Sequence, residues 1–378
     1  MYNVCMHTNK TDSAFESINK HEKLNEAYAK FLQISWAELN TFFLKIYEDR
    51  IKKLTPADLL KNYETNKFLK ISDADPRKIN KIENLLFDIV HPIYKIIDIS
   101  PISPIGINTV LAKINSKTSL STIRNLEVLG DPTTQLALET VKIKRANPSI
   151  DVVKLATSCR LLRTQNFDSK LGMSNHFKAF ALTAAGRNIG NRIFEFNTLQ
   201  EHLISWLDFF NKSKELGSKI KDIHVAISNI SIINELCEKG LIDKKDVVES
   251  IRYNKTSAFI KNSINLTREI ENILNIPHHE YPFLKDAIEM LKRAEIGFIQ
   301  ELRQKYPNVK FYYRLDRIAG STFYTGLCYK IYATTKDNVK HALVDGGVSN
   351  WNKQLLQNNK EMIFTSGFGT ELFSKFFL

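Results

Sequence analysis

Cysteine is scarce in this chain of 378 residues, which has four, at positions 5, 159, 237 and 328. A disulfide framework or a Cys-x-x-Cys metal site needs cysteines much closer together, so we expect reduced thiols. The histidines are also scattered, and the adjacent His278 and His279 have no Cys or carboxylate partner at ligand spacing. We therefore predict no metal site and interpret this pair as part of a polar loop before Pro282.

Long apolar runs are missing as well, since no stretch approaches the roughly 18 apolar residues that a membrane span requires. The N-terminus is polar and unlike a signal peptide, so the cytoplasm is the expected compartment and no membrane partner is expected. With 43% hydrophobic and 25% charged residues, the composition is that of an ordinary folded protein. The length suits two or three domains.

Positive charge is in excess, with a formal net charge of +12 and a pI near 9.3. Such an excess favours phosphate-bearing partners, including RNA and nucleotides. The lysines are dispersed along the chain, however, and there is no arginine-rich arm or aromatic–basic signature of an RNA-binding module. RNA is therefore a weakly supported partner.

The first 75 residues predict a helical region that is separate from the rest. From residue 21 to about 54, apolar residues recur at steps of three and four, which gives one stripe of a helix. Thr55-Pro56-Ala57-Asp58 is typical of a helix start, with a cap residue, a proline in the first turn and an acid three residues after the cap. We predict that residues 1–75 form a helical N-terminal extension.

Residues 76–378 predict a sheet whose strands are interrupted by helices. Apolar runs and period-two alternation indicate strands at 152–163, 176–186, 222–228, 309–315, 323–331, 341–344 and 362–365, with an extended edge at 96–104. Helices are expected after Pro76, from Thr198 with Glu201, and at 230–239, 282–304 and 369–377. This segregation predicts an α+β fold: an antiparallel sheet flanked by helices, with a helical insertion at about 196–305.

Glycines near the C-terminal end of the sequence have two interpretations. Gly367 and Gly369, in a turn that feeds a helix, offer backbone N–H groups and the positive end of a helix dipole to a phosphate or purine. They equally allow a strand to pack closely against a helix. Gly326 predicts a bulge or a close backbone approach, compatible with the floor of a ligand site. Tyr313, Tyr324 and Tyr329 fit either a pocket or a core.

Five motifs, in order and spacing, resemble the catalytic core of histidyl-tRNA synthetases. Leu315-Asp316-Arg317-Ile318-Ala319-Gly320-Ser321-Thr322-Phe323-Tyr324-Thr325-Gly326-Leu327 resembles their Arg-Gly-…-Tyr-Tyr-Thr-Gly signature, which the synthetase-like regulatory subunit of ATP phosphoribosyltransferase also has. Asp345-Gly346-Gly347 is similar to the Gly-Gly turn that follows it. Ser366-Gly367-Phe368-Gly369 looks like the third class II motif, and 154–186 like the second. Leu129-Gly130-Asp131-Pro132-Thr133-Thr134-Gln135 resembles the substrate-positioning segment.

The resemblance covers roughly residues 80–378 and implies a class II synthetase core with a ligand site. It implies that the motif-two arginine, in the catalytic role, is Arg160 or Arg163. The ligand-binding residues that it implies are Thr133, Gln135, Arg317, Tyr324, Thr325, Gly326, Gly346, Gly347, Gly367 and Gly369.

Several positions depart from the family pattern. The acid that usually follows the motif-two arginine is missing, and Thr183 or a neighbour replaces a later carboxylate. Ala319 stands where the signature has arginine, and the Gly-Gly-Arg turn ends in Val348. The third-motif arginine falls on or near Ser374, beside Lys375. Arginines offset negative charge at the α-phosphate during amino-acid activation, and losing one such contact can cost about 3–4 kcal/mol of barrier. The sequence also leaves no room after Leu378 for an anticodon-binding domain, so tRNA charging is not expected.

Three hypotheses follow. The first is a histidyl-tRNA-synthetase-like paralogue that acts as a ligand-binding or regulatory subunit. It would be a homodimer through the segment near Pro101–Pro104, with a small amino-acid-like or nucleotide ligand and a partner enzyme subunit. The alternative is a ligase that adenylates an amino acid or other carboxylate for a non-tRNA acceptor, using Arg160, Arg163, Arg317 and Lys375. ATP with Mg²⁺ is expected only for this ligase. The third is RNA binding through a basic N-terminal helical region.

Overall fold

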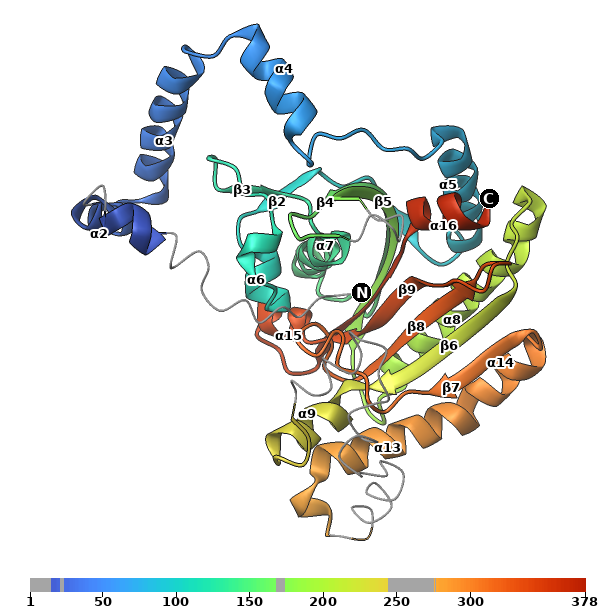
Figure 1. Ribbon diagram of the computed structural model, residues 1–378. Helices are drawn as coiled ribbons and strands as arrows, with labels where there is room; N and C mark the ends of the chain where they lie inside the picture. The colour runs from blue at the N-terminus through green and yellow to red at the C-terminus, as the bar shows by residue number, and fades with distance from the viewer. Residues whose placement is uncertain (1–14, 21–23, 168–173, 244–274, 276) are drawn as a thin grey trace.

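The computed structural model describes residues 15–20, 24–167, 174–243, 275 and 277–378. Within them, eight strands form one sheet in the order β1-β4-β5-β10-β9-β8-β6-β7 (Figure 1). Neighbouring strands are antiparallel except in the pairs β1–β4 and β6–β7, which are parallel. The strands are β1 (Lys95–Ile96), β4 (Val153–Leu162), β5 (His176–Arg187), β6 (Asp222–Asn229), β7 (Val309–Tyr313), β8 (Leu327–Thr334), β9 (Lys340–Ser349) and β10 (Glu361–Phe368).

Helices cover both faces of this sheet. Helix α7 (Pro132–Ala146) packs on β4, β5 and β10 from one side, where Leu136 contacts a cluster that includes Leu155 and Ala181. Helix α8 (Ile193–Lys212) packs on β5, β10 and β8, and α13 (Pro282–Ala294) packs on β6 and β8. Residues of both helices belong to the main core together with Phe180 and Leu182 of β5, which alternate with Ala181 and so face away from α7.

The remaining helices are shorter or lie at the edges of the sheet. Helix α5 (Pro76–Val90) packs on α8 and on α16 (Thr370–Phe377). Strands β2 (Ile102–Pro104) and β3 (Leu126–Val128) form a separate antiparallel pair. The other elements are α2 (Asn25–Gln33), α3 (Trp36–Ile51), α4 (Pro56–Thr65), α6 (Ile107–Ala112), α9 (Ile230–Glu238), α14 (Gln300–Lys305), α15 (Trp351–Leu356), a π-helical turn (Glu295–Ile299) and 3₁₀ turns at Ser116–Thr118, Ser213–Leu216 and His278–Glu280.

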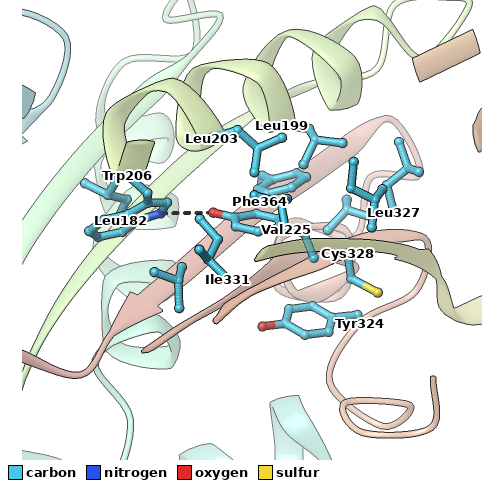
Figure 2. Close-up of a cluster of buried hydrophobic side chains, with 14 of the residues drawn as sticks. Leu182, Leu199, Leu203, Trp206, Val225, Tyr324, Leu327, Cys328, Ile331 and Phe364 are labelled. Carbon is cyan, nitrogen blue, oxygen red and sulfur yellow. Dashed lines mark hydrogen bonds between the residues drawn. The ribbon is translucent and has the colours of Figure 1, made fainter. Parts of the chain in front are cut away.

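Trp206 of α8 is fully buried and belongs to the main core (Figure 2). Its indole Nε1 donates to the Tyr329 hydroxyl at 3.0 Å and to Ser366 Oγ at 3.1 Å, and its ring stacks on Phe368. His202, one turn earlier, contacts the same Ser366 Oγ through Nδ1 at 2.8 Å. Burial lowers the pKa of His202 to about 3, so this imidazole is neutral. Trp206 and His202 of α8 are therefore joined by hydrogen bonds to Tyr329 of β8 and Ser366 of β10.

The N-terminal helices stand apart from this core. Figure 1 shows α2, α3 and α4 extending away from the sheet, and none of their residues is buried. Ser35 and Thr55 each form a full capping box with the acid three residues later, which accounts for the helix starts without any tertiary packing. None of the described helices is long and apolar enough to cross a membrane.

The predicted α+β class and the N-terminal helical region are confirmed, and most expected strands lie within a few residues of their predicted bounds. The strand expected at 309–315 is β7, but it pairs in parallel with β6, because α13 and α14 carry the chain back across the sheet. The segment 196–305 contains helices and also β6, which lies inside the main sheet.

Three expected boundaries were wrong. Helix α8 begins at Ile193, before the expected start at Thr198, because the chain turns at the left-handed residues Asn191 and Arg192. The strand expected from residue 323 begins at Leu327, since the preceding residues form a turn. The extended edge at 96–104 is divided between β1 and β2, which belong to different sheets.

The two tryptophans Trp36 and Trp351 test this division between extension and core. Trp36 of α3 is 61% exposed, whereas Trp351 of α15 is 1% exposed. Trp351→Ala should lower the free energy of unfolding by about 3–5 kcal/mol, because it leaves a large cavity. Trp36→Ala should change it by less than about 0.5 kcal/mol. Urea denaturation followed by circular dichroism measures both, and equal losses would mean that α3 packs on the core.

Candidate functional site

A cavity of about 190 Å³ lies on the α7 side of the sheet, next to the N-terminus of α7. Its lining comes from the facing ends of β4 and β5, from β8, β9 and β10, from the first turn of α16 and from the turn before β8. One water needs only about 10–15 Å³ of such space, so a small organic molecule fits.

The sheet register determines which side chains face the cavity. Lys330 of β8 is opposite Asp345 of β9, and Asp345 is opposite Gly367 of β10. Directly opposite residues share a face of an antiparallel sheet, and all three line the cavity. On the next row of the same face, Thr365 of β10 is opposite Gly347 of β9. The alternate residues of β10, such as Ser366, contact α8 through the other face.

Asp345 joins two cations beneath the cavity. Its Oδ1 accepts a hydrogen bond from Arg317 Nη2 at 2.6 Å, and its Oδ2 lies 3.3 Å from Lys330 Nζ. Burial raises the pKa of Asp345, but the charges of Arg317 and Lys330 outweigh burial and hold this pKa below its usual value. The side chain therefore stays ionised, and the cluster of Arg317, Lys330 and Asp345 carries one net positive charge.

A second ion pair lies at the start of α7. Asp131 caps this helix through Oδ1, which accepts from the backbone N–H and the hydroxyl of Thr133 at 2.9 and 2.6 Å. Arg163, just past β4, donates through Nη2 to Asp131 Oδ2 at 3.1 Å and through Nε to the carbonyl oxygen of Gly130 at 2.7 Å. Its guanidinium also lies over the ring of Phe177, 5.6 Å from the centroid.

Glu371, in the first turn of α16, is the third carboxylate of the lining. Its Oε2 accepts from Arg160 Nη1 at 3.2 Å and from the backbone N–H of Lys178 at 3.1 Å. Its Oε1 accepts from Ser72 Oγ at 2.6 Å and lies 3.6 Å from Lys375 Nζ. Ser72 belongs to the segment that links α4 to α5, so this segment contacts the wall of the cavity.

One polar atom of the lining has no partner. Thr365 is 0% exposed, and its Oγ1 makes no hydrogen bond within the described residues. A buried hydroxyl without a partner costs about 1–3 kcal/mol, so such a group is rare unless something else satisfies it. Beside it, a Cβ on Gly367 would meet nothing within 4 Å, so the cavity is open directly above this residue.

The structure brings only part of the expected site together. Of the predicted residues, those that line the cavity are Arg163, Thr133, Tyr324, Gly367 and Gly369. Arg317 lies behind the lining and acts on it through Asp345. Those that lie elsewhere are Arg160, Gln135, Thr325, Gly326, Gly346 and Gly347.

Close packing accounts for three of the glycines outside the cavity. A Cβ on Gly326 would lie 2.9 Å from Val348 Cγ1, so Gly326 packs on a neighbouring strand and does not floor the cavity. A Cβ on Gly346 would lie 2.7 Å from Tyr329, and one on Gly347 would lie 2.6 Å from Cys328 Cβ. Their roles as ligand contacts remain predictions.

Sequence reasoning missed Lys330, Asp345, Thr365 and Glu371 as site residues. A signal was present in β8, where Lys330 is a charged residue within an otherwise apolar strand. A lysine in such a position needs a buried counter-charge, and Asp345 was the nearest candidate on the following strand.

The carboxylates of the cavity do not fit Mg²⁺ as they stand. Mg²⁺ takes oxygen ligands, chiefly carboxylates and waters. Both oxygens of Asp131, Asp345 and Glu371 are already engaged by donors of this chain. Within the described residues, no three His, Cys, Asp or Glu side chains gather to hold a metal ion.

Comparisons with known proteins identify the fold. No protein-family model and no curated protein matches the chain. Solved structures do match. The ATP phosphoribosyltransferase regulatory subunit/histidyl-tRNA synthetase of Bacillus halodurans has 14% identity and a TM-score of 0.57, with 81% of each chain covered.

Two further structures agree. A histidine–tRNA ligase subunit of Alicyclobacillus acidocaldarius has 10% identity and a TM-score of 0.59, covering 82% of this chain and 95% of that one. The histidyl-tRNA synthetase of Nostoc sp. PCC 7120 has 14% identity and a TM-score of 0.55, covering 82% and 72%. The chain thus has the fold of the histidyl-tRNA synthetase core, and the predicted resemblance is confirmed at the level of the fold.

The glycines of the site can be tested as a pair. Gly347→Ala should lower the free energy of unfolding by about 2 kcal/mol, because its Cβ would overlap Cys328, Tyr324 and the carbonyl of Leu327. Gly367→Ala should leave stability within about 0.5 kcal/mol, since its Cβ enters the open cavity. Urea denaturation measures both. A larger loss for Gly367→Ala would show that its face of β10 is wrongly assigned.

The buried ion cluster gives a second test. Asp345→Asn leaves Arg317 and Lys330 without their counter-charge and should cost about 3 kcal/mol of stability. Asp49→Asn, which removes an exposed pair with Lys45, should cost less than about 0.5 kcal/mol. Because the folded-state pKa of Asp345 is depressed, its contribution is complete above the ordinary Asp pKa of about 3.9 and disappears at lower pH. Thermal melts of the wild type and Asp345→Asn should therefore converge below about pH 4.

Proposed function

We propose that this chain is a ligand-binding subunit with a histidyl-tRNA synthetase core that does not charge tRNA. The observation that supports it is the state of the cations at the cavity. Arg163 is paired with Asp131, and Lys330 is paired with Asp345. Each cationic side chain of the described lining thus already forms an ion pair with a carboxylate of the same wall.

Amino-acid activation, in contrast, needs cations that are available to the phosphates of ATP. Negative charge grows on the α-phosphate in the transition state, and cations placed in advance must offset it. To meet an ATP phosphate, Arg163 would have to leave Asp131 and the carbonyl of Gly130, and these bonds to charged or buried groups oppose the move. Ala319, Val348 and Ser374, at positions where the resemblance expects arginine, supply no substitute.

A regulatory role follows from the same proposal. One structure with this fold is described as a regulatory subunit of ATP phosphoribosyltransferase, and that description supports a partner enzyme subunit for this chain. A homodimer through the region of Pro101–Pro104 is also proposed, where Ile102 of β2 is 39% exposed. We further propose a cytoplasmic location.

RNA binding through the N-terminal region has less support. Residues 1–75 contain eleven Lys or Arg and eleven Asp or Glu, so this region is not basic. The net charge of +12 therefore comes entirely from residues 76–378. An electrostatic site for phosphates is not expected on α2, α3 or α4.

The ligase alternative retains one supporting observation, because Arg163 of the second motif lines the cavity. If the chain adenylates a carboxylate, Arg163 is the cation best placed at the phosphates. Arg160 lies outside the lining, where it contacts Glu371 and His176, and would not take part.

Exchange of pyrophosphate into ATP separates the two functions. Purified full-length protein, given each of the twenty amino acids in turn, should show only background exchange, while calorimetry detects a bound small molecule. Exchange above background with any amino acid would overturn the proposal. In that case Arg163→Ala should abolish exchange and Arg160→Ala, its matched control, should not.

A further inference from the structure

The cluster of Arg317, Lys330 and Asp345 has one positive charge that its own carboxylate does not balance. Two cations surround one carboxylate, and Arg317 and Lys330 are only 4% and 9% exposed. The neighbouring Cys328 does not compensate, since burial raises the pKa of its thiol to about 11 and keeps it neutral. A buried, unpaired charge is costly, so an anionic group in the cavity would stabilise this corner.

Hydrogen-bond donors for such a group are in place. Lys330 Nζ contacts Asp345 from within the cavity lining, and an ammonium can donate three hydrogen bonds. Thr365 Oγ1 is fully buried, lines the same cavity and has no partner in the described residues. Gly367, two residues from Thr365 on β10 and opposite Asp345 on β9, has no side chain and leaves open space in the cavity.

Each carboxylate of the lining is already paired with a cation of this chain. Asp131 is engaged by Thr133 and Arg163, and Glu371 by Ser72, Arg160, Lys375 and the Lys178 backbone. Asp345 is shared between Arg317 and Lys330. A zwitterionic amino acid would therefore bury its ammonium without an unpaired carboxylate to balance its charge, which is unfavourable.

Apart from polar side chains such as Gln165, Ser174 and Tyr324, the rest of the lining is apolar. It includes Leu161, Phe177, Ala179, Phe323, Leu343 and Leu372. These side chains suit the hydrocarbon or aromatic part of a ligand, but they have no polar group to contact a second charged group on it. A phosphate dianion would also exceed the single positive charge of the cluster.

From these observations we infer that the cavity binds a small monocarboxylate with an apolar body and no ammonium group. This inference rests on the proposed ligand-binding function and names its ligand class. Lys330 and Thr365 bind the carboxylate above Gly367, and Arg317 positions Lys330 and Asp345 from behind.

Calorimetry with the full-length protein tests the ligand class directly. The probes are 3-phenylpropanoate and the straight-chain carboxylates from butanoate to octanoate. They are compared with 3-phenylpropan-1-ol, phenyl phosphate, phenylalanine and histidine. At least one carboxylate should bind at least tenfold more tightly than the alcohol, the phosphate and both amino acids. Failure of every carboxylate to bind at 10 mM, roughly the weakest binding calorimetry detects, overturns the inference. Tighter binding of histidine or phenylalanine overturns it too, while leaving the ligand-binding function intact.

Three variants locate the carboxylate. Lys330→Met keeps the length of the side chain and should weaken binding about tenfold or more, the effect expected for a lost hydrogen bond to a charged group. Gly367→Ala fills the open space and should abolish binding without loss of stability. Thr365→Val should weaken binding about tenfold while leaving the melting temperature equal or higher, because it removes an unsatisfied hydroxyl.

Thr157→Val is the matched control for Thr365→Val. Thr157 is also 0% exposed with an unpartnered Oγ1, but it lies on β4 outside the cavity lining. Its replacement should leave the dissociation constant unchanged. If Thr157→Val and Thr365→Val weaken binding equally, the carboxylate site is not at Thr365.

Discussion

The indole N–H of Trp206 fixes the register on which both faces of the sheet depend. It donates to Tyr329 of β8 and Ser366 of β10, two polar groups on the α8 face. A slip of one residue in β10 would bury Ser366 on the opposite face and bring Thr365 beneath the indole. The same slip would remove Gly367 from the cavity. The register of β10 thus determines both the polar contact in the core and the open space on the other face of the sheet.

The sequence pattern predicted strands well where buried and exposed residues alternate. It did not predict the direction of a strand relative to its neighbour or the first residue of a helix. Period two indicates that residues 309–313 form a strand, but it says nothing about whether β7 runs parallel to its neighbour. Thr198 and Glu201 have the spacing of a capping box but lie inside α8, where Glu201 accepts from Tyr94 and Lys154. The spacing of a capping box in the sequence does not show whether its acidic residue caps a helix or contacts residues far away in the sequence, as Glu201 does.

The candidate site was predicted only in part for a related reason. Glycine and arginine are recognisable in a motif, and Arg163 and Gly367 do lie at the cavity. Lys330 and Asp345 meet only because β8 and β9 pair with a bulge, and Glu371 meets Ser72 across 299 residues of sequence. Gly346 and Gly347 matched a motif, yet the space they provide is filled by Tyr329, Cys328 and Tyr324. Figure 2 shows Tyr324 and Cys328 on the side of the sheet away from α8.

The position of β10 has a consequence for synthesis on the ribosome. This strand lies between β5 and β9, yet it begins at Glu361, long after β5 ends at Arg187. At about 5–20 residues per second, β5 waits roughly 10–35 s with one edge unpaired. An exposed, apolar strand edge is a template for pairing with other chains. The nascent protein is therefore expected to depend on chaperones, or on slow early collapse, until its central strand emerges.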